Sequence, residues 1–450
     1  MRYNVVRGTR DFLPSEMIKR KYIFTIIEEV FKTYGYLPIE TPSIENLNTL
    51  MGKYGEEGDR LIYKILKSGD YLRGVNQDED LDHRTLTSEI ADKGLRYDLT
   101  VPFARFVVNN RNDLVFPFKR YQIQPVWRAD RPQKGRYREF YQCDVDVIGS
   151  NSLLNELELC EIIDKVFLEL NLQVIIRINN RKILSSIAEL IGKPEMLIDI
   201  TVAIDKIDKI GYDKVVEELI EKGLNQDDIQ KIEPILSLEG SNREKLESLR
   251  PIIENTESGQ KGLEEIELLL ELIENANLSN ELVFDIRLAR GLNYYTGTIF
   301  EVESQENEIG SITGGGRYDD LTGIFGVKDL SGVGISFGAD RIYDCLEELG
   351  RFPEKIESTT EILFVNFGHK ESLKVLEYAQ ALRLKSISTE VYPDQAKLQR
   401  QMKYANDKNI NYVALVGERE MEEKKIMLKN MITGEQKLLG LEELIVYLQA

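Results

Sequence analysis

The chain has 450 residues, of which 42% are apolar, and its formal net charge is −19. Its length exceeds one ordinary domain, and its apolar content excludes a wholly disordered chain. Only three cysteines and two histidines are present, which excludes a disulfide framework, a Cys/His zinc finger and a histidine-rich metal centre. We therefore expect an acidic protein of two or three domains.

The N-terminal residues lack the apolar stretch of a signal peptide, and no run of about eighteen apolar residues follows. We therefore expect a cytoplasmic protein without a membrane span. The acidity is concentrated in residues 151–280, which carry −13, whereas residues 1–150 carry +2. The window from Arg128 to Arg138 has a net charge of +4. Most charge runs are solvated faces, but this one is also a candidate for nucleic-acid or phosphate binding.

Periodicity predicts the elements in chain order. Residues 15–34 have apolar side chains at helical spacing, and residues 70–94 are polar and predict a mobile or partly ordered loop. Residues 118–127 and 138–148 alternate and are rich in β-formers, so they predict a long hairpin around the basic window. Residues 151–170 return to helical spacing.

The second half of the chain contains three regions with different predicted secondary structure. Residues 180–278 are rich in Leu, Ile, Glu and Lys with short breaks, which predicts a separate helical domain. Residues 310–321 contain three consecutive glycines and favour a Gly-rich turn, and residues 331–350 predict a strand, a tight turn and a helix. After the linker-like residues 351–360, β-like and helical segments alternate, which predicts a small, mostly parallel sheet.

One face of the second predicted hairpin strand combines charged, amide and aromatic side chains. If residues 138–148 alternate regularly, one face is apolar, while the other offers a cation, an aromatic ring, an amide and two carboxylates. A half-buried strand would also show one polar face. A ring flanked by a guanidinium and an amide is nevertheless what a nucleotide pocket requires. The polar face consists of Arg138, Phe140, Gln142, Asp144 and Asp146.

Three further motifs are ambiguous by themselves. The adjacent Tyr294 and Tyr295 follow Arg290 and Gly291, and they are as consistent with core tyrosines as with a site. The glycines of residues 310–321 match neither common phosphate-binding pattern. Arg341 falls in the first turn of a predicted helix, where a cation is locally unfavourable, which suggests a ligand or a carboxylate beside it.

Together these motifs resemble the histidyl-tRNA synthetase family of class II aminoacyl-tRNA synthetases, essentially end to end. GTRDFLPSE resembles the N-terminal signature, and YGYLPIETPSIENL is similar to class II motif 1. WRADRPQKGRYREFYQCDVDVIG resembles motif 2, and GISFGADRIYDCL resembles motif 3. RGLNYYTGTIFE and GGGRYDDL resemble the histidine-specific strings, and their occurrence in this order is highly specific.

The resemblance implies a fold and its boundaries. It implies an α+β class II catalytic core, an antiparallel six-stranded sheet flanked by helices, with a helical insertion and a C-terminal α/β anticodon-binding domain. The expected divisions are 1–175 and 281–350 for the core, 176–280 for the insertion, 351–360 for the linker and 361–450 for the anticodon-binding domain.

The resemblance also implies a reaction and its partners. L-Histidine would attack the α-phosphate of ATP to give histidyl-adenylate, and the terminal ribose of histidine tRNA would then take the histidyl group. Mg²⁺ would bridge the phosphates, and no protein metal site is expected. The chain would be a homodimer that meets both the acceptor end and the anticodon of its tRNA.

By matching motif positions, the resemblance implies roles for individual residues. Arg128 and Arg290 would be catalytic. ATP would contact Arg128, Asp130, Arg138, Phe140 and Arg341. Histidine would contact Asp98, Leu99, Thr100, Arg128, Gln142, Asp146, Arg290, Tyr294 and Tyr295. The acceptor end of the tRNA would meet Arg131, Gln133 and Arg136 of the basic loop.

Two alternatives stay open at this stage. A non-catalytic, synthetase-like regulatory subunit of ATP phosphoribosyltransferase shares the core, but typically lacks the C-terminal domain and loses motif residues. A class II synthetase for another amino acid would lack the two histidine-specific strings. Both alternatives disagree with the motifs that this chain retains.

Overall fold

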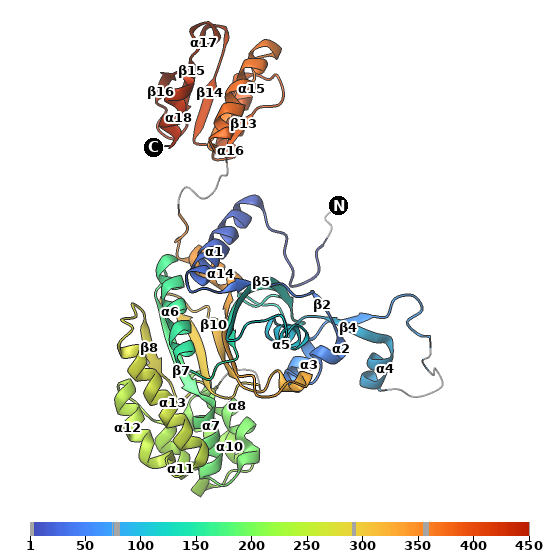
Figure 1. The fold of residues 1–450 in the computed structure, drawn as a ribbon, viewed down its shortest axis with the longest axis vertical. Coiled ribbons are helices and arrows are strands. Elements are labelled where there is room, and N and C mark those ends of the chain that lie inside the picture. The colour runs from blue at the N-terminus through green and yellow to red at the C-terminus, as the bar shows by residue number, and fades with distance from the viewer. Residues whose placement is uncertain (1–3, 74, 76–81, 290–293, 354–359, 450) are drawn as a thin grey trace. The chain divides into compact units, whose positions relative to one another are not determined.

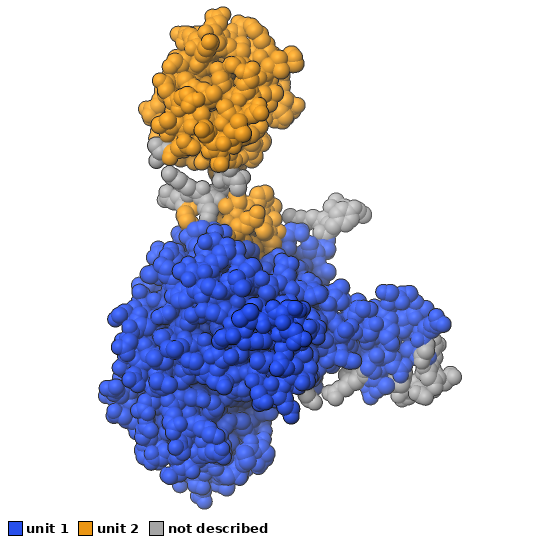
Figure 2. All heavy atoms as spheres, in the orientation of Figure 1, with its two compact units in different colours: residues 1–11, 22–351 blue, residues 12–21, 352–450 orange. Residues whose placement is uncertain are grey.

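The computed structural model describes all residues except 1–3, 74, 76–81, 290–293, 354–359 and 450. The chain divides into two compact units (Figure 2). Unit 1 comprises residues 1–11 and 22–351, and unit 2 comprises residues 12–21 and 352–450. Helix α1, Pro14–Thr33, runs through the division and matches the predicted helix of residues 15–34. Among the described residues, no helix is long and apolar enough to cross a membrane.

Unit 1 is built on an eight-stranded sheet with the order β1-β5-β6-β11-β10-β9-β7-β8. The six strands from β5 to β7 in this order are antiparallel to their neighbours, as expected. The edge strands β1 and β8 are parallel to their neighbours, so the sheet as a whole is mixed. The strands are β1 Leu37–Pro38, β5 Phe118–Trp127, β6 Glu139–Ile148, β7 Val174–Asn180, β8 Glu281–Phe284, β9 Thr298–Ser304, β10 Ser311–Tyr318 and β11 Gly332–Gly338.

The two faces of this sheet differ because side chains alternate along each strand. On one face, Cys143, Val145 and Val147 of β6 lie opposite apolar residues of β11 and are fully buried. Helices α6, Leu154–Glu169, and α14, Ala339–Glu348, pack against these central strands. The ring of Phe167 on α6, for example, lies 5.8 Å from that of Phe337. The apolar face is thus the core, and the other face is left for polar residues.

The described part of residues 44–109 forms a smaller layer beside the main sheet. A three-stranded sheet has the order β2-β4-β3, with β2 Ile44–Asn46, β3 Lys64–Leu66 and β4 Ala91–Leu95. The helices are α2 Leu47–Leu50, α3 Gly55–Leu61, α4 His83–Ile90 and α5 Thr100–Asn109. The prediction of a loop over residues 70–94 is therefore wrong for α4 and β4. Backbone pairing of β4 with both β2 and β3 outweighs the polarity of these residues.

The helical insertion is confirmed as a group of helices that gathers at one end of unit 1 (Figure 1). It begins at Arg181, because residues 174–180 form β7 of the main sheet. The helices are α7 Arg181–Leu190, α8 Leu197–Ile204, α9 Ile207–Ile210, α10 Tyr212–Glu221, α11 Gln226–Leu236, α12 Asn242–Ile253 and α13 Glu257–Glu274, with a short 3₁₀ turn at Pro194–Met196. A second 3₁₀ turn, Gly323–Phe325, lies outside this group, between β10 and β11.

The prediction of a Gly-rich turn over residues 310–321 is wrong, because Ser311–Tyr318 form strand β10. Two of its three glycines, Gly315 and Gly316, serve close packing rather than a turn. A Cβ on Gly315 would lie 2.1 Å from the carbonyl oxygen of Gly334, and one on Gly316 would lie 2.8 Å from the ring of Tyr295. Strand interiors use glycine where another chain segment approaches this closely.

Unit 2 contains a five-stranded sheet with the order β13-β12-β14-β15-β16. Strands β12 Ile362–Phe364, β13 Thr389–Val391 and β14 Tyr412–Leu415 are parallel, as expected. Strands β15 Ile426–Asn430 and β16 Gln436–Leu439 add an antiparallel hairpin, so the expectation of a mostly parallel sheet is wrong. Gly434, at φ +75°, supplies the turn of this hairpin. The helices are α15 His369–Leu384, α16 Leu398–Asp407, α17 Glu418–Glu423 and α18 Leu441–Gln449.

Candidate active site

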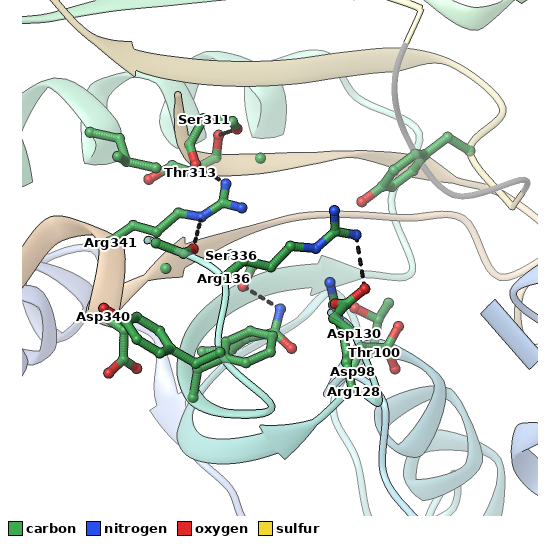
Figure 3. A pocket seen from close by; sticks show the side chains of 18 of the residues that line it. Asp98, Thr100, Arg128, Asp130, Arg136, Ser311, Thr313, Ser336, Asp340 and Arg341 are labelled. Atoms are coloured by element: carbon green, nitrogen blue, oxygen red, sulfur yellow. Dashed lines mark hydrogen bonds and ion pairs between the residues drawn. The ribbon is translucent and has the colours of Figure 1, made fainter. Parts of the chain in front are cut away.

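A cavity of about 470 Å³ lies on the polar face of the main sheet. Its wall combines the N-terminal end of α5, the loop between β5 and β6, and the strands β6, β10 and β11 with the start of α14. Figure 3 shows Arg341 beside Ser311 and Thr313, with Arg136 extending toward Asp130. The lining residues are Asp98, Thr100, Arg128, Asp130, Gly135, Arg136, Tyr137, Phe140, Gln142, Tyr294, Tyr295, Ser311, Ile312, Thr313, Gly314, Ser336, Gly338, Asp340 and Arg341.

Arg128 sits between two aromatic rings in this cavity. Its guanidinium carbon lies 4.2 Å from the ring centroid of Tyr97 and 5.2 Å from that of Phe140. Its Nε donates to the carbonyl oxygen of Tyr97 at 3.1 Å, which fixes the plane of the group. The backbone N–H of Arg128 donates to Arg138 across the hairpin, so the strand pair holds the whole residue in place. A fixed guanidinium beside an aromatic ring can bind a phosphate or carboxylate next to a stacked base.

Asp98 provides a buried carboxylate at the start of α5. Tyr54 donates its hydroxyl to Oδ1 at 2.8 Å, the N–H of Val101 donates to the same oxygen at 3.2 Å, and Tyr294 donates to Oδ2 at 3.4 Å. Burial raises the pKa of Asp98, and these hydrogen bonds oppose the rise. A buried carboxylate with aromatic hydroxyls around it suits an ammonium or imidazole N–H donor.

Tyr294 and Tyr295 both face the cavity, although they are adjacent in sequence. Their rings lie 4.9 Å apart at 67°, an edge-to-face arrangement. Strand β9 begins only at Thr298, so the two tyrosines precede the alternation of that strand. This resolves the ambiguity between core and site: each ring packs against the apolar cluster near α5 while also lining the cavity.

Arg341 lies in the first turn of α14, and its guanidinium donates hydrogen bonds to two backbone carbonyls. Its Nε donates to Gly135 at 2.7 Å, and its Nη1 donates to Ser311. The neighbouring Asp340 accepts hydrogen bonds from the N–H of Tyr141 and from Arg10. Arg341 thus connects the helix to the basic loop and to β10, and it presents a cation at the cavity wall.

The structure brings most of the predicted site residues together. Asp98, Thr100, Arg128, Asp130, Arg136, Phe140, Gln142, Tyr294, Tyr295 and Arg341 all line the cavity. Arg290 lies outside the described residues, so its predicted catalytic role is not placed by the structure.

Five predicted residues do not line the cavity. Leu99 is fully buried, and Asp146 lies in an ion pair with Arg120 at 2.8 Å. The side chain of Arg138 donates to the carbonyl oxygens of Asp130 and Arg7 instead. Arg131 and Gln133 lie in the basic loop without reaching the cavity wall.

Several lining residues were not predicted from the sequence. Ser311 and Thr313 lie two residues apart on strand β10, in the segment whose glycines favour a turn in sequence. Ser336 lies on the same β11 face as Gly334 and Gly338, and that alternation was the available signal. Tyr137 stacks under the guanidinium of Arg10, 3.3 Å from ring centroid to carbon, a contact between segments far apart in sequence.

The described residues contain no group of three or more His, Cys, Asp or Glu side chains able to hold a metal ion. All three cysteines are buried, and burial raises the pKa of Cys345 to about 11. None of them lines the cavity. The arrangement therefore suits binding and charge stabilisation of an anionic substrate rather than covalent catalysis by a thiolate.

Comparison with known proteins identifies the family. A model described as Histidyl-tRNA synthetase matches residues 8–342, and one described as Anticodon binding domain matches residues 362–450. The chain is 57% identical to the histidine–tRNA ligase of Bacteroides fragilis (strain YCH46), with 98% of each chain covered. It is also 57% identical to that of Phocaeicola vulgatus, with 99% of each covered. The crystal structure of histidyl-tRNA synthetase from Nostoc sp. PCC 7120 superposes with a TM-score of 0.85 at 30% identity, covering 100% of this chain and 99% of that one. The chain belongs to the histidyl-tRNA synthetase family.

Proposed function

We propose that this chain joins L-histidine to histidine tRNA at the expense of ATP. One observation carries the proposal: a single cavity gathers Arg128, Phe140 and Arg341, which suit a nucleoside triphosphate, with Asp98 and Gln142, which suit an amino acid. Family membership over both the catalytic and the anticodon-binding models supports it.

In the first step, a carboxylate oxygen of histidine attacks the α-phosphorus of ATP. The bond from that phosphorus to the oxygen bridging to the β-phosphate breaks, and pyrophosphate leaves. In the second step, a hydroxyl of the terminal tRNA ribose attacks the histidyl carbonyl carbon, and AMP leaves. Neither step needs a protein nucleophile, so positioning and charge stabilisation carry the catalysis.

The residues that we assign to ATP binding contact different parts of the nucleotide. Phe140 and Asp130 both line the cavity. We assign Phe140 to stacking on adenine and Asp130 to the adenine or ribose side. Arg128 meets the α-phosphate and the histidine carboxylate, and Arg341 holds the γ-phosphate. Arg290 would add a second cation at the α-phosphate.

On the amino-acid side of the cavity, protein side chains form hydrogen bonds with the polar atoms of histidine. Asp98 and Gln142 accept hydrogen bonds from N–H donors of the substrate, and the tyrosine hydroxyls pair with the imidazole. A site built to pair both ring nitrogens rejects analogues without them by roughly 10⁴–10⁵, so no editing site is required. Leu99 and Asp146 support this pocket from beneath rather than by direct contact.

Mg²⁺ neutralises phosphate charge when it enters with ATP. Mg²⁺ is usually held by substrate phosphates, waters and one or two carboxylates. The described residues offer no dedicated cage. We therefore assign the ion to the phosphates of the substrate and give it no protein ligand set.

We further propose a homodimer in the cytoplasm. β1 is an edge strand of the main sheet, and the apolar side chains of Leu37 in this strand and of Ile44 in β2 are about half exposed, at 59% and 50%. Light scattering on the purified chain tests the dimer by its mass.

The regulatory-subunit alternative is not favoured. The anticodon-binding model matches residues 362–450, and Arg128, Gln142 and Arg341 are all retained in one cavity. Transfer of labelled histidine to histidine tRNA tests the proposed function directly. Charging that requires both ATP and this tRNA supports it, whereas folded protein that charges no tRNA refutes it.

A further inference from the structure

The two tyrosines of the cavity lie against the end of strand β10. Tyr295 lies directly over Gly316, because a Cβ on that glycine would be 2.8 Å from Cδ1 of the ring. Tyr294 packs edge to face against Tyr318, with 6.2 Å between ring centroids and 87° between ring planes. The positions of both hydroxyls therefore depend on how the chain that follows the tyrosines is attached to β10.

Thr296, the next residue, is attached to the end of β10 by three hydrogen bonds. Its backbone N–H donates to the carbonyl oxygen of Arg317 at 2.8 Å. Its hydroxyl donates to Oδ2 of Asp319 at 2.6 Å and accepts the backbone N–H of Asp319 at 3.1 Å. A hydroxyl has only one hydrogen, and the carbonyl oxygen of Arg317 is a more distant acceptor for it, at 3.4 Å. The Thr296 side chain is thus held on both its donor and its acceptor side by Asp319.

Asp319 is itself fixed by Ser331, which precedes β11. The Ser331 hydroxyl donates to Oδ1 of Asp319 at 2.5 Å and accepts from Nη1 of Arg317 at 2.5 Å. Arg317 is paired in turn with Glu156 of helix α6. A continuous chain of hydrogen bonds therefore runs from a core helix to the residue that follows the tyrosine pair.

The Asp319 carboxylate is not needed to neutralise the buried Arg317. That arginine already has a bidentate partner in Glu156, and its Nη1 lies 3.9 Å from Oδ1 of Asp319. The Asp319 side chain is also 39% exposed, so it is not a charge enclosed in the core. What this carboxylate supplies is two acceptor oxygens for the hydroxyls of two different segments. It joins the segment before β9 to the segment before β11.

We propose that Asp319 is a positioning residue for histidine binding, which holds the Thr296 hydroxyl and thereby fixes Tyr294 and Tyr295 at the amino-acid side of the cavity. Neither Asp319 nor Thr296 lines the cavity, so both act through the tyrosines. Hydrogen bonds to an imidazole require a narrow range of distances and angles, and side chains locked in advance lose less conformational freedom when the substrate binds. This inference rests on the proposed function, which assigns the two tyrosines to histidine.

Two substitutions at Thr296 separate its hydroxyl from its shape. Thr296→Val keeps the branched shape but removes the hydroxyl, so the KM for histidine in pyrophosphate exchange should rise roughly 5- to 50-fold, up to the value of one hydrogen bond to a charged group. Thr296→Ser keeps the hydroxyl, and its histidine KM should stay within about twofold of wild type. Equal KM values in the two variants would mean that the hydroxyl has no such role and would overturn the proposal.

The effect should be confined to histidine. In Thr296→Val the KM for ATP should stay within about twofold, because Phe140 and Arg341 lie outside this chain of hydrogen bonds. L-Histidinol keeps the imidazole and the ammonium but lacks the carboxylate proposed to meet Arg128. Its inhibition constant should rise by the same factor as the histidine KM. Equal increases in the KM values for ATP and histidine would indicate a general loss of structure and would contradict the proposal.

A double-mutant cycle shows whether Asp319 acts through Thr296. Asp319→Ala should raise the histidine KM at least as much as Thr296→Val, and the double variant should be no worse than Asp319→Ala alone. Effects that multiply would mean that the two residues act separately, which would refute the proposed connection. If the Ala variant does not fold, Asp319→Asn takes its place, because it keeps the size of the side chain but replaces one acceptor oxygen by a donor.

Asp320→Ala is the matched control. This exposed carboxylate is the next residue in the chain, and it does not line the cavity. Its loss should leave the histidine KM unchanged. Wild-type protein that shows no histidine-dependent exchange would refute the proposed function. An active wild type whose histidine KM is unchanged by Thr296→Val and by Asp319→Ala refutes only the positioning role of Asp319.

Discussion

The side chain of Arg341 donates its Nε hydrogen to the backbone carbonyl of Gly135 at 2.7 Å. This bond connects the first turn of α14 to the loop between β5 and β6 across 206 positions of sequence. The proposed γ-phosphate ligand is thereby held against the loop proposed to contact tRNA. Binding of ATP at Arg341 and the conformation of that loop are physically connected.

Arg341→Ala should raise the KM for ATP and lower kcat/KM for ATP by roughly 10²–10³, because one charge-assisted contact to the phosphates is lost. Arg351→Ala is a matched control, since this arginine follows the same helix but pairs with Glu306 at 2.6 Å. Pyrophosphate exchange at varied ATP concentration measures both variants. Equal ATP kinetics in the two variants would contradict the assignment of Arg341.

Protonation of Asp98 should weaken histidine binding at low pH. Its pKa is raised by burial, so the carboxylate is ionised above a pH that lies above the ordinary carboxyl range and becomes protonated as pH falls through it. Histidine affinity should therefore fall at low pH in the wild type. Asp98→Asn should weaken histidine binding at every pH. It should also remove the part of the fall in histidine affinity at low pH that comes from protonation of Asp98. Titration of both proteins under the same conditions cancels the ionisation of histidine itself, and parallel profiles would refute the prediction.

Gly315→Ala should destabilise unit 1 by about 1–3 kcal/mol or more, because the new Cβ would lie 2.1 Å from the carbonyl oxygen of Gly334. Gly314→Ala is the matched control on the same strand, since its Cβ would meet only the Phe300 carbonyl oxygen at 3.5 Å. Denaturant unfolding followed by tyrosine and tryptophan fluorescence compares the two. Similar losses would show that β10 does not pack against β11 as described.

Glu156 forms a bidentate ion pair with Arg317, with both side chains almost fully buried. Glu156→Ala should cost roughly 3–5 kcal/mol, because Arg317 is left charged and unpaired in the core. Glu169→Ala on the same helix breaks only an exposed pair with Lys165 and should cost less than about 1 kcal/mol. Urea unfolding of the two variants distinguishes these costs, and a small effect of Glu156→Ala would show that the core tolerates the unpaired arginine.

Charge removal in the basic loop should weaken tRNA binding. Arg131→Ala should raise the KM for histidine tRNA and reduce the salt slope of binding by about 0.7–1, because one phosphate contact is lost. Histidine-dependent pyrophosphate exchange should be unchanged, since Arg131 does not line the cavity. Arg111→Ala, at another exposed arginine outside this loop, is the control. An unchanged tRNA KM after removal of both Arg131 and Arg136 would refute the contact.

The central strands could be predicted because β5 and β6 alternate in sequence as they do in space. Phe140 and Gln142 were found from that alternation, and both line the cavity. The same alternation predicts that Arg138 shares their face, but its guanidinium donates to the backbone carbonyls of Asp130 and Arg7 instead of lining the cavity. Alternation along a strand does not reveal a neighbouring segment, such as residues 7 and 8, that attracts a long side chain at the end of the strand.

Other features depend on tertiary contacts that no local pattern reveals. Three consecutive glycines, Gly314–Gly316, favour a turn in sequence because glycine lowers strand propensity, whereas the close approach of Gly334 and Tyr295 is what requires Gly315 and Gly316. The pairing of Arg120 with Asp146 joins two strands, but periodicity could not show that Asp146 lies beneath the cavity rather than in it. Residues 83–95 are polar, yet sheet pairing on both sides orders β4.

The most direct test of the account is ATP–pyrophosphate exchange by the purified chain with histidine or proline, with and without Arg290→Ala. Exchange that requires histidine, ignores proline and falls sharply in the variant is the predicted result. Folded wild-type protein that exchanges no pyrophosphate with histidine in the presence of Mg²⁺ would contradict the account. That result would favour the non-catalytic, synthetase-like regulatory subunit instead.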